Sequence, residues 1–159
     1  MNVLPGMESQ LVVFEDKPVY DKLNKYLIIG IIAIPLIVAI VLLTQDILGA
    51  GIMFGVTFFD AILFWCILPK KFLVFEDRLK IVLGGPFSYT IPFKDIVEVK
   101  KATKDMAIIY WGMRLGTSLH FQVEIKRKNG LSVLISPSME NEFIEQLNQA
   151  RENYVEPAF

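Results

Sequence analysis

Two long apolar runs dominate the first half of the chain. Residues 26–45 carry no charged side chain and are almost wholly aliphatic, without the polar face of a soluble amphipathic helix. Twenty helical residues at 1.5 Å each span about 30 Å, the thickness of a bilayer core. A second run, residues 47–68, carries a single charge, Asp60. The pattern predicts two transmembrane helices, the first kinked rather than broken at Pro35.

The flanks of these runs predict their arrangement. Only residues 44–46 separate them, so the two helices should form an antiparallel hairpin. Basic residues precede the first run and follow the second, whereas the connecting turn has none: Lys17, Lys22, Lys25, Lys70 and Lys71. Because basic flanks stay inside, both termini should be cytoplasmic, with the protein multi-pass in the plasma (inner) membrane. The first run lacks the short apolar core and cleavage site of a signal peptide.

The second half of the chain shows the short, alternating apolar pattern of β-strands. Strict alternation is clearest over 119–127, where Leu119, Phe121, Val123 and Ile125 should face a core. Asn129-Gly130 then predicts a type I′ turn. The predicted strands are Phe72–Phe75, Leu79–Leu83, Tyr89–Phe93, Ile96–Lys100, Leu119–Arg127 and Leu131–Ile135. About six or seven antiparallel strands are expected.

An amphipathic helix closes the chain. Ser136 is the expected N-cap and Pro137 the expected first helical residue. An apolar stripe should cover the sheet: Met139, Phe143, Ile144 and Leu147. The predicted fold is thus an α+β membrane protein, a transmembrane hairpin followed by a small curved β-sheet or barrel capped by the last helix. We divide it into a cytoplasmic N-terminal segment (1–25), the hairpin (26–68) and a cytoplasmic domain (69–159), and expect residues 71–154 to fold without the hairpin.

The amino-acid composition narrows the classes of function that the chain could have. The chain is 53% hydrophobic with a mean hydropathy of +0.47, which is high for a soluble domain. From Lys70 onward 13 basic residues face 11 acidic ones, too weak a bias to indicate a nucleic-acid partner. With one cysteine, Cys66, and one histidine, His120, little is left for metal binding or acid–base chemistry. No phosphate loop, nucleophile elbow, CxxC or HExxH occurs, so we expect no enzyme and no cofactor.

Several segments together carry a family resemblance. They are IPFKDI at 91–96, the aromatic-Gly-x-Arg piece at 111–114 and the helical ending at 135–147. In this order, after a hydrophobic hairpin, they resemble membrane-anchored proteins with a bacterial pleckstrin-homology-like (bPH) domain, over about residues 20–152. The resemblance implies a PH-like barrel and a non-catalytic role. It does not imply phosphoinositide binding, for which no basic cage can be mapped residue by residue.

Three residues in the second span are candidates for partner contact. An ionised group inside a bilayer costs about 2.5–3.5 kcal/mol on insertion scales, so Asp60 should face protein or water. Asp60 could contact a neighbouring subunit, lie inside the hairpin with a hydrogen bond to Thr57, or take part in ion translocation. Ion translocation normally needs several ionisable groups in the membrane, and the first span has none. Gly51 and Gly55 form a GxxxG, which permits close helix approach. Gly55 and Asp60 are about 140° apart around the helix, so the glycine side and the acid side of the second span differ. One of these sides could face the first span and the other a partner.

Basic residues in the domain are candidates for headgroup or protein contact. They form two clusters, with one further arginine: Lys100, Lys101 and Lys104; Lys126, Arg127 and Lys128; and Arg114. Each lysine or arginine near an anionic surface adds about 1 kcal/mol of attraction, although solvated strand ends have the same composition. His120 should be exposed and idle, and Cys66 a plain thiol or a lipidation site.

These observations favour a non-enzymatic interaction module, an accessory or scaffold subunit of a membrane complex. Its expected partners are membrane lipids and other membrane subunits or further copies of itself, and not nucleic acid. The alternative is a lipid-headgroup-sensing protein that uses the basic clusters.

Overall fold

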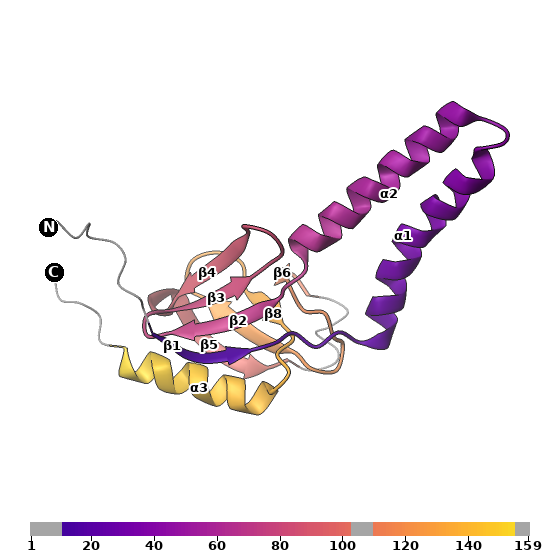
Figure 1. Ribbon diagram of the computed structural model, residues 1–159. Helices are drawn as coiled ribbons and strands as arrows, with labels where there is room; N and C mark the ends of the chain where they lie inside the picture. Colours follow the sequence, from indigo (N-terminus) through magenta and orange to yellow (C-terminus); the bar gives the residue numbers. More distant parts are fainter. Residues whose placement is uncertain (1–10, 103–109, 155–159) are drawn as a thin grey trace, which may run out of the picture.

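The computed structural model describes residues 11–102 and 110–154. Helices α1 (Lys22–Leu42) and α2 (Ile47–Ile67) form an antiparallel hairpin that projects from a β domain (Figure 1). The domain contains β1 (Val12–Asp16), β2 (Lys71–Phe75), β3 (Arg78–Val82), β4 (Ser88–Pro92), the 3₁₀ turn η1 (Phe93–Asp95), β5 (Ile96–Lys101), β6 (Met113–Arg114), β7 (Val123–Arg127), β8 (Val133–Ile135) and α3 (Glu140–Asn153).

The two hairpin helices are long and apolar enough to cross a membrane. Each has 21 residues, with a mean hydropathy of 2.7 for α1 and 2.0 for α2. Only 6% and 11% of their apolar windows are buried, so neither helix is packed in the core of the domain. Helix α1 continues through Pro35, as the sequence predicts. The Asp46 carboxylate caps α2 by accepting from the backbone N–H of Leu48 at 3.1 Å.

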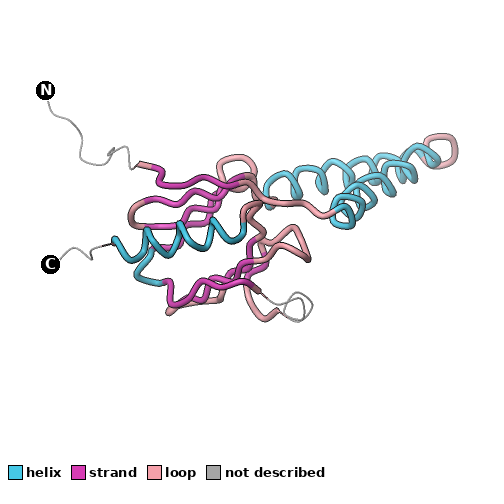
Figure 2. Tube along the Cα trace, turned by 90° about the horizontal axis from the view of Figure 1, so that it is seen from below, coloured by secondary structure: helices cyan, strands magenta, loops and turns pink. Residues whose placement is uncertain are grey.

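The domain consists of two four-stranded sheets with α3 along one open side (Figure 2). The first has the order β1-β2-β3-β4 and is antiparallel throughout; the second has the order β5-β7-β8-β6, with β6 parallel to β8. One core joins both sheets and the helix, and its largest fully buried members include Phe72, Leu79, Ile81, Ile91, Ile125, Ile135, Phe143 and Leu147. The predicted sheet domain and terminal helix are confirmed, but the described residues form eight strands rather than six or seven, and β6 pairs parallel and not antiparallel with β8.

The start of α3 differs from the prediction. The helix begins at Glu140, and the Ser136 hydroxyl instead accepts from the backbone N–H groups of Thr117 and Ser118, both at 3.1 Å. The carboxylate of Asp16, at the end of β1, satisfies this end of the helix. It accepts from the Met139 N–H at 3.0 Å and from the Ser138 hydroxyl. Ser136 as the N-cap and Pro137 as the first helical residue are therefore wrong: the N-cap residue is Met139, and its own N–H is bonded by the distant Asp16.

The predicted strand over 119–127 is also too long. Residues 118–121 bend around the Ser118 hydroxyl, which accepts from the N–H groups of His120 and Phe121, and pairing starts only at Val123. As a result Phe121 is 44% exposed, while the polar Gln122 and Glu124 are buried. The turn at 129–130 is not type I′, which needs two residues with positive φ. Among the described residues only the glycines Gly85 and Gly130 have positive φ.

Strand β1 is the main feature that the sequence pattern does not predict. It lies within the segment assigned as a separate N-terminal region (1–25), yet it pairs antiparallel with β2, with Asp16 opposite Phe72. Lys71 Nζ lies 2.8 Å from the Glu15 carboxylate across this pair. Helix α1 likewise begins at Lys22, four residues before the predicted boundary. The helical hairpin is therefore an insertion between two neighbouring strands of one sheet.

Candidate functional site

The junction between hairpin and domain is built on Asp21, the residue before α1. Its backbone is extended, and its side chain makes no capping bond to its own helix. The carboxylate instead accepts from the Ser118 hydroxyl at 2.9 Å and from the Leu119 N–H at 2.5 Å. Bonds to a charged acceptor are worth about 1.5–3 kcal/mol each. Asp21 thus ties the start of the hairpin to the loop before β7.

Further hydrogen bonds surround this aspartate. The Thr117 hydroxyl donates to the Val19 carbonyl, and the Asn24 amide donates to the Thr117 carbonyl, both at 2.5 Å. The Tyr20 hydroxyl donates to the Pro69 carbonyl at 2.6 Å, linking the two ends of the hairpin, and burial raises the pKa of Tyr20. A displacement of either helix end would have to break bonds in the domain.

On α2, the structure separates the acid from the glycines. The residues between Ala50 and Phe64 that are buried or half-buried recur at heptad spacing and form the side facing α1: Ala50, Met53, Thr57, Asp60 and Phe64. Asp60 lies on this side, and in the described part of the chain it has no hydrogen bond or ion pair. The Thr57 hydroxyl donates to the Met53 carbonyl at 2.9 Å and so is not its donor.

Gly51 and Gly55 lie on exposed positions of α2, away from that side. A Cβ built on either glycine would meet nothing within 4 Å. The hairpin therefore does not use the GxxxG for its own packing, and this face of α2 is open.

The basic clusters are largely paired with acids. Lys126 Nζ lies 2.9 Å from the Glu98 carboxylate and Lys100 Nζ 3.6 Å from that of Glu124, while Lys101 pairs with Glu140. The hydrogen bond with Lys126 lowers the pKa of Glu98, and the same bond raises the pKa of Lys126. These charges largely cancel one another along β5 and β7.

The remaining predicted residues do not converge on one place. Arg127 has its guanidinium over the Tyr89 ring and 3.8 Å from the Asp95 carboxylate. Lys128 and Arg114 are exposed, as is His120. Lys104 lies outside the described residues, and Cys66 is a half-buried free thiol. Together with the ion pairs above, this gives no basic cage among the described residues.

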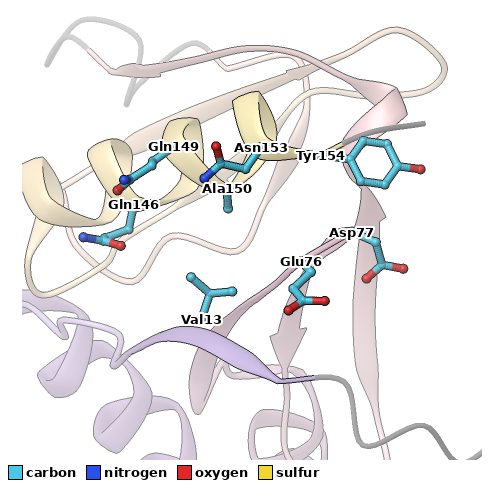
Figure 3. A pocket seen from close by; sticks show the side chains of 8 residues that line it. All are labelled: Val13, Glu76, Asp77, Gln146, Gln149, Ala150, Asn153 and Tyr154. Carbon is cyan, nitrogen blue, oxygen red and sulfur yellow. The ribbon is translucent and has the colours of Figure 1, made fainter. Parts of the chain in front are cut away.

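A groove of about 600 Å³ opens beside the C-terminal half of α3 (Figure 3). It lies between α3 and the β2–β3 turn, and carboxylates and amides dominate its lining: Val13, Glu76, Asp77, Gln146, Gln149, Ala150, Asn153 and Tyr154. Within 11–102 and 110–154, no group of three or more histidine, cysteine or acidic side chains could hold a metal ion.

Tyr110 lies outside the groove. Burial and the Glu124 carboxylate raise the pKa of Tyr110 to about 12, so this phenol stays protonated at neutral pH.

Sequence reasoning missed the residues that build the junction. Asp16 and Asp21 stand in a short segment with mixed charges, and their partners lie about a hundred positions further along the chain. Ser118 directly precedes the predicted strand Leu119–Arg127, and Ser136 is the residue predicted to cap the last helix. The only signals available in the sequence are two aspartates. Asp16 ends the short strand-like run VVFED, and Asp21 stands shortly before the predicted first span.

One comparison with known proteins identifies the domain. The family model described as "Bacterial PH domain" matches residues 70–151, just over half of the chain, from the end of the hairpin to the last turn of α3. No curated protein and no solved structure matches the chain. The matched region excludes β1, although that strand completes the first sheet. The chain belongs to the bacterial PH domain family, and two apolar helices consistent with membrane anchoring precede the matched domain.

Proposed function

We propose that this protein is a non-enzymatic, membrane-anchored interaction module, an accessory or scaffold subunit of a membrane complex. Helices α1 and α2 cross the plasma membrane, the PH domain lies on the cytoplasmic side, and the open glycine face of α2 docks a helix of another subunit or a second copy. The observation that carries the proposal is the open space at Gly51 and Gly55, on a helix whose other side already packs against α1.

The physics of helix association in lipid supports this reading. Lipid tails are as apolar as leucine, so helices associate through close packing and hydrogen bonds rather than through the hydrophobic effect. Small residues allow the close approach that such packing needs. A GxxxG unused within its own hairpin is available to another helix.

The paired basic residues make headgroup sensing the weaker alternative. A lysine attracts an anionic membrane only with uncompensated charge, and Glu98, Glu124 and Glu140 neutralise much of the charge of Lys100, Lys101 and Lys126. The proposal therefore places recognition in the membrane helices and leaves the domain free to present its surfaces to proteins.

The glycine face can be tested by filling it. Gly51→Leu with Gly55→Leu should insert normally and leave the hairpin intact, because a Cβ at either position meets nothing within 4 Å and both positions are exposed. Assembly should be lost, since the added volume blocks close approach. Native gels of mild-detergent extracts, with co-purified partners identified, provide the measurement.

Gly30→Leu is the matched control for this experiment, since Gly30 lies in α1 and a Cβ there also meets nothing within 4 Å. It should assemble like the unmodified protein. Assembly that survives the double substitution would rule out this face as the docking surface.

Asp60 gives an independent test of partner contact. Asp60 is half-buried on the side of α2 that faces α1, so a donor from another subunit has to reach it between the two helices. If one does, Asp60→Leu should insert at least as well and yet weaken assembly. A hydrogen bond between two transmembrane helices is worth about 0.6–2 kcal/mol, which is up to roughly thirtyfold in an association constant. Survival of assembly in Asp60→Asn but not in Asp60→Leu indicates a neutral hydrogen bond, and loss in both indicates a charge pair. Intact assembly in both variants, seen on the same native gels, would confine Asp60 to the hairpin.

A further inference from the structure

The loop between β3 and β4 packs directly on the last turns of α2 (Figure 1). A Cβ on Gly84 would lie 1.5 Å from the backbone carbonyl oxygen of Trp65, so only glycine permits this contact. Gly85 has a φ of +64°, and a Cβ there would lie 3.1 Å from the Trp65 ring and 3.8 Å from Cδ2 of Phe87. The rings of Trp65 and Phe87 thus flank the same glycine.

This loop has the chemistry of a surface that meets lipid. No charged residue occurs between Lys80 and Lys94, a stretch of 13 residues. At its centre Phe87 is 52% exposed, beside Trp65, which is 55% exposed. The Lys70 N–H donates to the Val82 carbonyl at 2.7 Å, so the first basic residue after α2 lies next to the loop. Tryptophan and lysine at the end of a span mark the headgroup level of a bilayer.

We propose that residues Gly84–Phe87 enter the interface of the bilayer, with the Phe87 ring in the boundary between headgroups and acyl chains. The inference rests on the proposed function, namely that α1 and α2 span the membrane. Because Trp65 lies in the last turns of a span and Phe87 lies across Gly85 from it, the two rings share one depth. An exposed phenylalanine in water leaves apolar area unburied, and the interface buries it. The domain is then fixed against the membrane by this loop as well as by the junction at Asp21.

Spin-label accessibility tests the depth of the loop. In the full chain with Cys66→Ser, a nitroxide is attached at Phe87→Cys and the protein is reconstituted in vesicles of phosphatidylcholine and phosphatidylglycerol. Collision rates with oxygen, which concentrates in lipid, and with a water-soluble nickel chelate are measured. Phe58→Cys, 70% exposed within α2, is the membrane reference, and Val97→Cys, 60% exposed on β5, is the water reference. Ser88→Cys, also exposed, repeats the measurement at the neighbouring position.

The label at Phe87 should collide with the nickel chelate several-fold less often than the label at Val97, while collisions with oxygen stay frequent. Equal nickel accessibility at Phe87 and Val97, with Phe58 protected, would overturn the inference and leave the hairpin in the membrane. Protection of Phe87 from both reagents would overturn it too, because protein and not lipid would then cover the ring. A Phe58 label as accessible to nickel as that at Val97 would instead contradict the proposed function itself.

Discussion

A chain that begins at residue 70 should fail to form a stable domain, although the family match begins there. This replaces the expectation from the sequence that residues 71–154 fold by themselves, because β1 lies outside that range and pairs with β2. Strand β1 pairs with one edge of β2, and its Phe14 ring packs on that of Phe143, with 6.3 Å between the centroids. Its last residue, Asp16, is 2% exposed and accepts three hydrogen bonds, two of them from Ser138 and Met139 just before α3. Hydrogen bonds to a charged group contribute about 1.5–3 kcal/mol each, against a total stability of about 5–15 kcal/mol for a small domain.

A second chain, which keeps β1 but lacks the hairpin helices α1 and α2, provides the matched comparison. Replacing residues 22–67 by a short Gly/Ser linker is feasible because Tyr20 and Pro69 are in direct contact at the two ends of the hairpin. This soluble chain should melt cooperatively by circular dichroism, whereas residues 70–154 alone should show no cooperative transition. Equal melting temperatures for the two chains would mean that β1 contributes nothing to the fold.

Phe143→Asp should unfold the domain. The side chain is fully buried between Phe14 and Phe72, with edge-to-face ring contacts at centroid distances of 6.3 and 6.0 Å. Losing a buried phenylalanine costs about 3–5 kcal/mol even when alanine replaces it. An unpaired charge left in the same place adds several kcal/mol more, which exceeds the stability of most domains of this size.

The control for this substitution introduces the same residue at an exposed position of the same helix, Asn141→Asp. Its melting temperature should stay close to that of the unmodified domain, since acids are favourable in the first turn of a helix. Leu147→Ala, which should cost about 2–5 kcal/mol, gives an intermediate effect where Phe143→Asp yields no soluble protein. A cooperative melt unchanged by Phe143→Asp would contradict the role of α3 as a cover for the sheets.

The features predicted correctly from the sequence are those with a local period. The two apolar runs, the short alternating strands β2 to β5 and the stripe at Phe143 and Leu147 each repeat over a few residues. Their burial follows from that repeat. The hairpin follows from the short link at 44–46.

The features that were missed depend on partners far apart in the chain. Strand β1 reads VVFED, with Val12 and Val13 about half exposed, and its partner strand follows only after the whole hairpin. The bend at Ser118 is set by Asp21 and breaks an alternation that is perfect in the sequence. At the buried Gln122 and Glu124, the Gln122 amide donates to the Ser118 carbonyl, and the Glu124 carboxylate pairs with Lys100. Such bonds leave no periodic trace.

The side of the membrane on which each segment lies tests the central claim most directly. Antiparallel pairing of β1 with β2 puts Asp16 opposite Phe72, so the segment between them must cross the bilayer an even number of times or not at all. Reporter fusions after Pro69 and after Tyr154 should both report the cytoplasm, and an insertion at Asp46 should report the opposite side. A cytoplasmic reporter at Asp46 would show that the hairpin does not cross the membrane, and an extracytoplasmic C-terminus would contradict the proposed orientation of the whole protein.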